Sequence, residues 1–309
     1  MTDKSKISTE PYKGVRDFYP EDMAIQNYIF GVWRKISESL GFVEYTASIL
    51  EPAELYRAKS GEELVNEQMF TFTDRGDREV ALRPEMTPSL ARMIAAQRKS
   101  LKFPLKWYSI PNLFRYEKPQ RGRKREHWQL NCDIMGITDL SAEVEIISLA
   151  YEIMKAFGAK DEDFEIKIND RVLLREKFES QDLIKLLDRK DKMPTEEFAQ
   201  KWQEISGKEF EDNIEPNETI KELLKKLADR GVKNVTFSPT ITRGFDYYTG
   251  VVFEVFDTNP ENRRSLFGGG RYDNLLEIFG AEPVPTVGFG MGDVTIRDFL
   301  ETHGLPLKV

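Results

Sequence analysis

A cationic loop lies between two segments of alternating hydrophobicity near the middle of the chain. Residues 114–133 begin with the apolar Phe114 followed by Arg115, and they continue through a turn-prone centre at 119–122. They then return to strict alternation. Trp128, Leu130 and Cys132 share one face of that return, and Gln129, Asn131 and Asp133 share the other. The pattern predicts two strands joined by a long loop.

The loop carries a dense group of positive charges, although the chain has a formal net charge of −8. Its cations are Lys118, Arg121, Arg123, Lys124 and Arg125. Such a cluster on an acidic protein favours an anionic ligand. A solvated surface hairpin is the alternative. The ligand interpretation is preferred because Arg115, Glu117, Gln129 and Asp133 lie at the strand ends beside apolar positions, which are typical of a cleft.

Composition excludes several classes of protein. With 309 residues, 40% of them hydrophobic, the chain can form one large domain or two modest ones. It lacks a long apolar run and begins with a polar segment, so we expect a cytoplasmic protein without membrane association. Cys132 is the single cysteine, and His127 and His303 are the two histidines. No metal site is therefore predicted from side chains, and the chemistry must rely on Arg, Glu, Asp, Tyr and backbone groups.

Periodicity and turn residues predict an α+β fold with a mixed, mostly antiparallel sheet flanked by helices. The expected helices are 21–40, 53–59, 89–97, 141–157, 274–279 and 293–303. The expected strands, besides those of the central stretch, are 42–50, 69–73, 79–82, 164–168, 235–237, 251–256 and 287–292. Charged amphipathic segments predict a small helical insertion at 171–232.

Three further segments carry ligand-type side chains. Glu85, Met86 and Thr87 lie at a strand-to-helix turn, where capping by Thr87 is the alternative explanation. Arg243, Tyr247 and Tyr248 precede an apolar strand. A glycine triplet at 268–270 precedes Arg271 and Tyr272.

Together these segments resemble the histidyl-tRNA synthetases, a family of class II aminoacyl-tRNA synthetases. The central stretch resembles motif 2, LRPEMT resembles the family's histidine-binding LRPE-x-T segment, and the two tyrosine segments match its signatures RG-x-DYYTG and GGGRYD. The order of helix 21–40, strand and proline resembles motif 1, which implies a homodimer. The resemblance covers nearly the whole of 1–309, as the catalytic domain, and the family's C-terminal anticodon-binding domain is expected to be absent.

The resemblance implies activation of L-histidine by ATP, taken up with Mg²⁺, and transfer to the acceptor end of tRNA(His). Arg115 and Arg243 would be catalytic and grip the α-phosphate and the carboxylate, while Arg115, Glu117 and Arg123 would hold ATP. Glu85 and Tyr248 would bind the imidazole, and Thr87, Gln129 and Asp133 the ammonium group. The full expected histidine pocket is Glu85, Met86, Thr87, Gln129, Asp133, Tyr247, Tyr248 and Tyr272.

One position departs from the family. Motif 3 places an arginine for the γ-phosphate at the position of Thr295, and the nearest arginine is Arg297, about 200° further around a helix. Two alternatives to the synthetase remain open: a catalytically silent, histidine-sensing regulatory subunit of ATP phosphoribosyltransferase, and an adenylate-forming enzyme with another acceptor.

Overall fold

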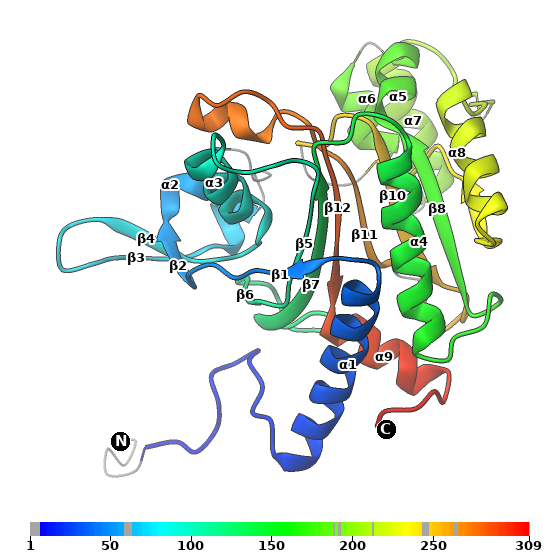
Figure 1. The fold of residues 1–309 in the computed structure, drawn as a ribbon. Coiled ribbons are helices and arrows are strands. Elements are labelled where there is room, and N and C mark those ends of the chain that lie inside the picture. The colour runs from blue at the N-terminus through cyan, green and yellow to red at the C-terminus, as the bar shows by residue number, and fades with distance from the viewer. Residues whose placement is uncertain are drawn as a thin grey trace, which may run out of the picture.

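The computed structural model describes residues 7–58, 64–178, 180–187, 189–190, 193–211, 213–242, 247–262 and 265–308. Its centre is a large mixed sheet in which the strands follow the order β1-β5-β7-β12-β11-β10-β8-β9, with β6 beside β7 (Figure 1). Neighbours are antiparallel except in the pairs β1–β5 and β8–β9. The expected mixed, mostly antiparallel sheet is therefore confirmed. The bounds are β1 Val43–Glu44, β5 Leu105–Ser109, β6 Asn112–Phe114, β7 Glu126–Met135, β8 Phe164–Asp170, β9 Val235–Phe237, β10 Val251–Asp257, β11 Ser265–Arg271 and β12 Thr286–Gly292.

Helices cover one face of this sheet and bury its apolar side chains. They are α1 (Pro20–Ser39), α4 (Ser141–Ala156), α8 (Glu218–Asp229) and α9 (Asp293–Thr302). Trp33 of α1 and Leu130 and Cys132 of β7 are fully buried in this shared core. The alternation of β7 thus directs its even-numbered side chains toward the helices, as the sequence predicts.

A second layer covers part of the other face. A small sheet in the order β2-β4-β3 lies beside α2, η1 and α3, and η3 packs against α3 (Figure 1). The bounds are β2 Leu50–Pro52, α2 Ala53–Arg57, η1 Leu64–Gln68, β3 Phe70–Thr73, β4 Glu79–Leu82, α3 Thr87–Gln97 and η3 Leu275–Phe279. Leu90 and Ile94 of α3 share a buried cluster with Met135 of β7.

The single strand expected at 42–50 is wrong. The segment forms β1, which pairs with β5 of the large sheet, and β2, which pairs with β4 of the small sheet. The chain crosses from one sheet to the other between them. Hydrophobicity indicates an extended backbone but does not specify which strand will pair with it, so this break is invisible in the sequence.

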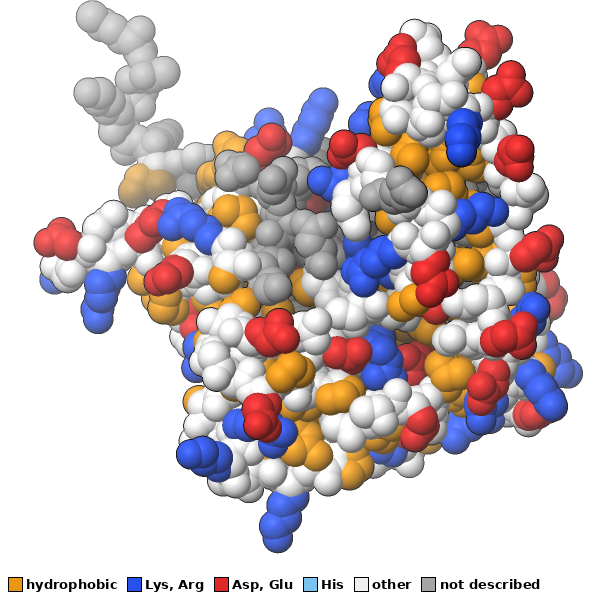
Figure 2. Space-filling model, turned by 90° about the horizontal axis from the view of Figure 1, so that it is seen from above, with side chains coloured by type: hydrophobic (Ala, Val, Ile, Leu, Met, Phe, Trp, Pro, Cys, Tyr) orange, Lys and Arg blue, Asp and Glu red, His pale blue; other side chains and the backbone are white. Residues whose placement is uncertain are grey.

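Helices also dominate the segment for which an insertion is predicted. α5 (Arg171–Lys177), α6 (Gln181–Leu187) and α7 (Thr195–Ser206) surround a small core of their own, whose largest members are Phe198 and Trp202. α8, in contrast, buries Ile220, Leu223 and Leu227 in the main core. Figure 2 shows acidic and basic side chains interspersed over the face seen from above. No helix in the described part of the chain is long and apolar enough to cross a bilayer.

Candidate active site

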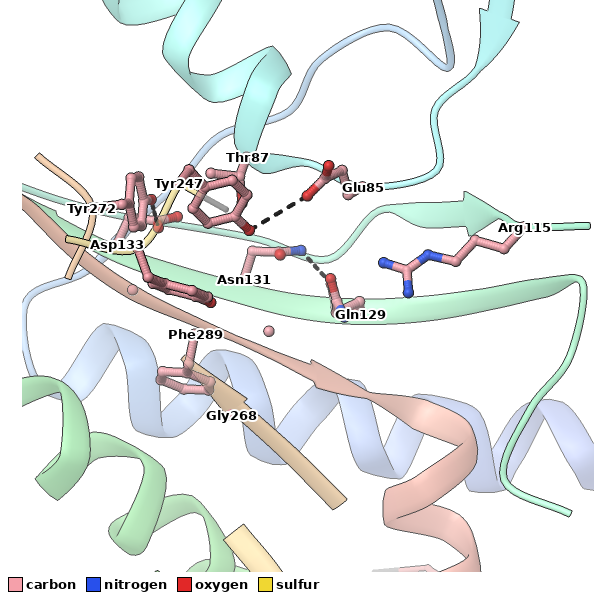
Figure 3. Close-up of a pocket in the computed structure, with 13 residues that line it drawn as sticks. Glu85, Thr87, Arg115, Gln129, Asn131, Asp133, Tyr247, Gly268, Tyr272 and Phe289 are labelled. Atoms are coloured by element: carbon pink, nitrogen blue, oxygen red, sulfur yellow. Dashed lines mark hydrogen bonds between the residues drawn. The ribbon is translucent and has the colours of Figure 1, made fainter. Parts of the chain in front are cut away.

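A pocket opens on the face of the sheet opposite α1, where segments distant in the sequence converge. Its walls come from the strand-to-helix turn before α3, from Arg115 after β6, from β7, from the loop before β10, and from β11, β12 and the residue after β11 (Figure 3). The lining residues are Glu85, Thr87, Arg115, Gln129, Asn131, Asp133, Tyr247, Tyr248, Gly268, Tyr272, Gly288, Phe289 and Gly290. The ligand-type segments identified in the sequence therefore meet in one place.

A row of polar side chains from β7 runs along the pocket. Gln129, Asn131 and Asp133 alternate with the buried Leu130 and Cys132, so they point to the opposite face from the core. Arg115 lies at one end of the row and Asp133 at the other, with Gln129 between them (Figure 3). The pocket thus has a cationic end and an acidic end.

The acidic end is fully desolvated. Burial raises the pKa of Asp133 to about 7, although a hydrogen bond donated by the Tyr272 hydroxyl lowers it in part. Burial and the nearby Asp133 carboxylate raise the pKa of Tyr272 well above its ordinary value, so the phenol remains protonated and acts as a donor. A buried carboxyl group whose pKa lies near 7, next to a hydroxyl group, is suited to bind a polar ring that both donates and accepts hydrogen bonds.

Glycines form the floor of the pocket. Gly288 and Gly290 of β12 lie opposite Asp133 and Asn131 of β7. A Cβ at Gly288 would collide with the Asp133 carboxylate, and one at Gly290 would lie 2.7 Å from Cδ of Gln129. The glycines of β11, for which a turn is the usual expectation, are also strand residues. The missing side chains of Gly288 and Gly290 leave room for Asp133 and Gln129 to lie against the sheet and line the pocket.

The turn before α3 supplies the opposite wall. Tyr247 donates a hydrogen bond of 3.4 Å to Glu85, and Nε of Arg115 donates one of 2.8 Å to the carbonyl of Pro84. Arg115 is thereby fixed against the segment that carries Glu85. The N-cap of α3 is Met86, without a side-chain capping bond, whereas Thr87 lines the pocket. The capping explanation for Thr87 is therefore wrong.

Some of the predicted site residues lie outside the pocket lining. Met86 is buried beside it, and Glu117 forms a 3.4 Å ion pair with the half-exposed Arg123 in the loop between β6 and β7. Arg243 lies outside the described residues.

Conversely, sequence analysis did not propose Asn131, Phe289 or the floor glycines as site residues. The alternation of β7 already placed Asn131 on the correct face, but the glycines required knowledge of the strand order.

Arg297 does not take the place left by Thr295. Its guanidinium pairs with Asp22 of α1 at 3.1 Å and with Glu301 at 2.8 Å. Thr295 instead lies near Gly122 in the basic loop and donates a 2.8 Å hydrogen bond to the carbonyl of Leu266. The helical offset between the two positions directs Arg297 toward α1 rather than toward the loop.

Comparison with known proteins identifies the family. The family model described as Histidyl-tRNA synthetase matches residues 14–206 and 173–294. Histidine--tRNA ligase of Leptospira biflexa is 44% identical over 333 aligned positions, which cover 98% of this chain and 76% of that protein. The ligase of Thermoplasma volcanium is 40% identical, with 97% and 76% covered.

Solved structures show the same fold at lower identity. Histidyl-tRNA synthetase from Nostoc sp. PCC 7120 superposes with a TM-score of 0.81 at 22% identity, covering 98% of this chain and 78% of that one. A protein from Bacillus halodurans, described as an ATP phosphoribosyltransferase regulatory subunit/histidyl-tRNA synthetase, has a TM-score of 0.76 at 24% identity. It covers 94% of this chain and 83% of its own.

Proposed function

Because the chain belongs to the histidyl-tRNA synthetase family, we propose that it activates L-histidine with ATP and transfers it to tRNA(His). The observation that carries the proposal is the polar pocket with Arg115 at one end and Asp133 with Tyr272 at the other (Figure 3). In this reaction a carboxylate oxygen of histidine attacks the α-phosphate of ATP, and pyrophosphate leaves. Positive charge must lie where the phosphate and carboxylate meet.

The polarity of the pocket supports one orientation of histidine. The α-carboxylate belongs at Arg115, so the side chain extends along β7 toward Asp133. We therefore assign the imidazole to Asp133 and Tyr272, and the ammonium group to Glu85, Thr87 and Gln129. The family resemblance alone had assigned Glu85 to the imidazole and Asp133 to the ammonium group, so the two residues exchange roles. A pocket of this kind rejects apolar amino acids because its buried polar groups would lose their partners.

Arg243 is proposed to grip the α-phosphate opposite Arg115, and Arg123 and Glu117 to hold the outer parts of ATP, which enters as its Mg²⁺ complex. Such a role makes the charge of Arg243 most important in the transition state. Arg243→Ala should then reduce the activation rate by at least about 10²-fold, by analogy with the loss of one oxyanion donor, while histidine affinity changes little.

We also propose a homodimer that forms through α1 and β1. β1 is an edge strand of the large sheet, and its Val43 side chain is 62% exposed. An exposed apolar edge strand is a favourable surface for pairing with a second chain.

The direct test of the main proposal is ATP–pyrophosphate exchange that depends on L-histidine. Exchange supports a synthetase. Histidine binding by calorimetry without any exchange would instead support the regulatory-subunit alternative, for which the Bacillus halodurans neighbour is the precedent in fold. Exchange without transfer to tRNA(His) would favour an adenylate-forming enzyme with another acceptor.

A further inference from the structure

An arginine from the N-terminal segment is fixed at the start of α9. Nη2 of Arg16 donates a 2.7 Å hydrogen bond to Oδ2 of Asp293, the first residue of that helix. Asp293 is fully buried and also accepts hydrogen bonds from Nε2 of Gln26 and from the backbone N–H of Trp128, both at 2.9 Å. The Arg16 guanidinium lies 4.9 Å from the ring centroid of Phe18. Asp293 is thus fixed by α1 and β7, and Asp293 together with the ring of Phe18 holds Arg16 in position.

The donors of Arg16 are not all used by these contacts. Its Nε atom is buried and has no hydrogen-bond acceptor within the described residues, while the side chain as a whole keeps 18% of its surface exposed. A buried N–H without an acceptor is costly, so such a group is normally satisfied by water or by a ligand. An anion with several oxygens is a ligand that accepts from this donor and from the other N–H groups of the same guanidinium.

Arg16 is held beside β7, because its partner Asp293 also accepts a hydrogen bond from the backbone N–H of Trp128, the residue before Gln129. His127 lies on β7 two positions before Gln129 and therefore points to the pocket face. Desolvation first, and then the charges of Arg115 and Arg16, lower the pKa of His127 to about 3. The geometry therefore puts Arg16 next to the β7 segment that leads into the arginine end of the pocket.

Three other arginines at this end are directed elsewhere, which leaves Arg123 as the loop cation already assigned to ATP. Arg121 bonds Asp298 at 2.8 Å, and Arg297 pairs with Asp22 and Glu301. Arg125 packs over the ring of Tyr116 and donates to the carbonyl of Glu117. Arg16 combines a fixed position, an unused buried donor and a place beside β7.

We propose that Arg16 binds the β- and γ-phosphates of ATP, in place of the cation that Thr295 does not provide, and that Asp293 is its positioning residue. This inference rests on the proposed function. As the histidine carboxylate forms a bond to the α-phosphorus, the bond to the bridging oxygen breaks and its electron pair leaves with pyrophosphate. Arg16 would stabilise that departing charge, whereas Arg115 acts at the α-phosphate.

The test compares Arg16→Ala and Arg16→Lys with the matched control Arg297→Ala. Arg297 is also an arginine paired with an acid near α9, but it points toward α1. We expect Arg16→Ala to raise the KM for ATP at least about tenfold, the size of one lost charged hydrogen bond. Arg16→Lys should recover only part of the loss because lysine lacks the forked geometry. The Kd for histidine, measured by calorimetry, should remain within twofold of the parent in all three variants.

A rescue experiment separates phosphate binding from a structural role. Adding Thr295→Arg to Arg16→Ala should restore much of the ATP affinity, because Thr295 lies near the basic loop. An unchanged KM for ATP in Arg16→Ala, or an equal loss of histidine affinity, would overturn the inference.

If the parent shows no exchange at all, the proposed function fails instead. Binding of α,β-methylene-ATP with Mg²⁺, compared between the parent and Arg16→Ala, then still decides whether Arg16 holds phosphates: equal affinity would reject it, and a tenfold loss would support it.

Discussion

The hydroxyl of Tyr272 donates a hydrogen bond to Oδ1 of Asp133, a residue 139 positions earlier in the chain. This contact joins β7 to the segment that follows β11, and it closes the acidic end of the pocket. Both groups are buried, so each depends on the other for a partner. It is the relationship on which our assignment of the imidazole site depends.

Asp133→Asn should weaken histidine binding by about 10- to 100-fold, because a hydrogen bond to a charged group contributes about 1.5–3 kcal/mol. Calorimetric titration with L-histidine measures this. Glu152→Gln, which changes an exposed acid on α4, is the control and should bind like the parent. Equal affinity in Asp133→Asn and the parent would remove Asp133 from the imidazole site.

A methyl group on the floor of the pocket should block the ligand without unfolding the protein. In Gly290→Ala the new Cβ would meet the flexible end of Gln129, which must move. We expect at least about a tenfold loss of histidine affinity and a change in unfolding free energy of about 1–3 kcal/mol, typical of overpacking. Circular dichroism and calorimetry check the two effects separately. Unchanged affinity would mean that the ligand does not lie over Gly290.

Local patterns predicted much of this site, and long-range pairing explains what they missed. The alternation of Gln129, Asn131 and Asp133 identified the pocket face before any strand order was known. The position of Gly288 beneath Asp133 depends on the pairing of β12 with β7, which no local signal specifies. Arg16 carries no local signal for the same reason, because its partner Asp293 lies 277 residues away.

The buried ion pair between Arg271 and Glu143 should be a determinant of stability rather than of binding. Nε of Arg271 lies 2.5 Å from the carboxylate of Glu143 on α4, and the two side chains are 11% and 2% exposed. Glu143→Gln removes the nearer counter-charge of a buried guanidinium and leaves Asp273 at 3.4 Å. Breaking a buried ion pair typically costs about 3–5 kcal/mol. Urea unfolding should show this loss. The exposed pair Lys201–Glu197 is the control, and its Glu197→Gln variant should change stability by at most about 0.5 kcal/mol.

The proposed dimer predicts a concentration-dependent assembly that a charge on the edge strand disrupts. Val43→Lys should shift the protein from dimer to monomer in sedimentation at micromolar concentration, because an exposed lysine opposes edge pairing. Phe72→Lys, at an exposed apolar residue of the small sheet, tests whether any added charge has the same effect. A parent chain that sediments as a monomer would contradict the dimer.

His127 should make the protein less stable in acid. Its pKa is about 3 in the folded chain and near the ordinary value of 6.5 when unfolded, so the unfolded state binds the extra proton between these limits. The free energy of unfolding should therefore fall as pH drops below about 6.5, and this contribution should be constant above it.

His127→Phe keeps a flat ring and removes the titration. Asp133 has a raised pKa and contributes the opposite slope up to about pH 7, but it is present in both proteins. Urea unfolding at pH 7 and pH 5 should thus show a larger acid loss in the parent than in His127→Phe. Equal losses would mean that the imidazole is charged in the folded state, and that Arg16 and Arg115 do not act on it.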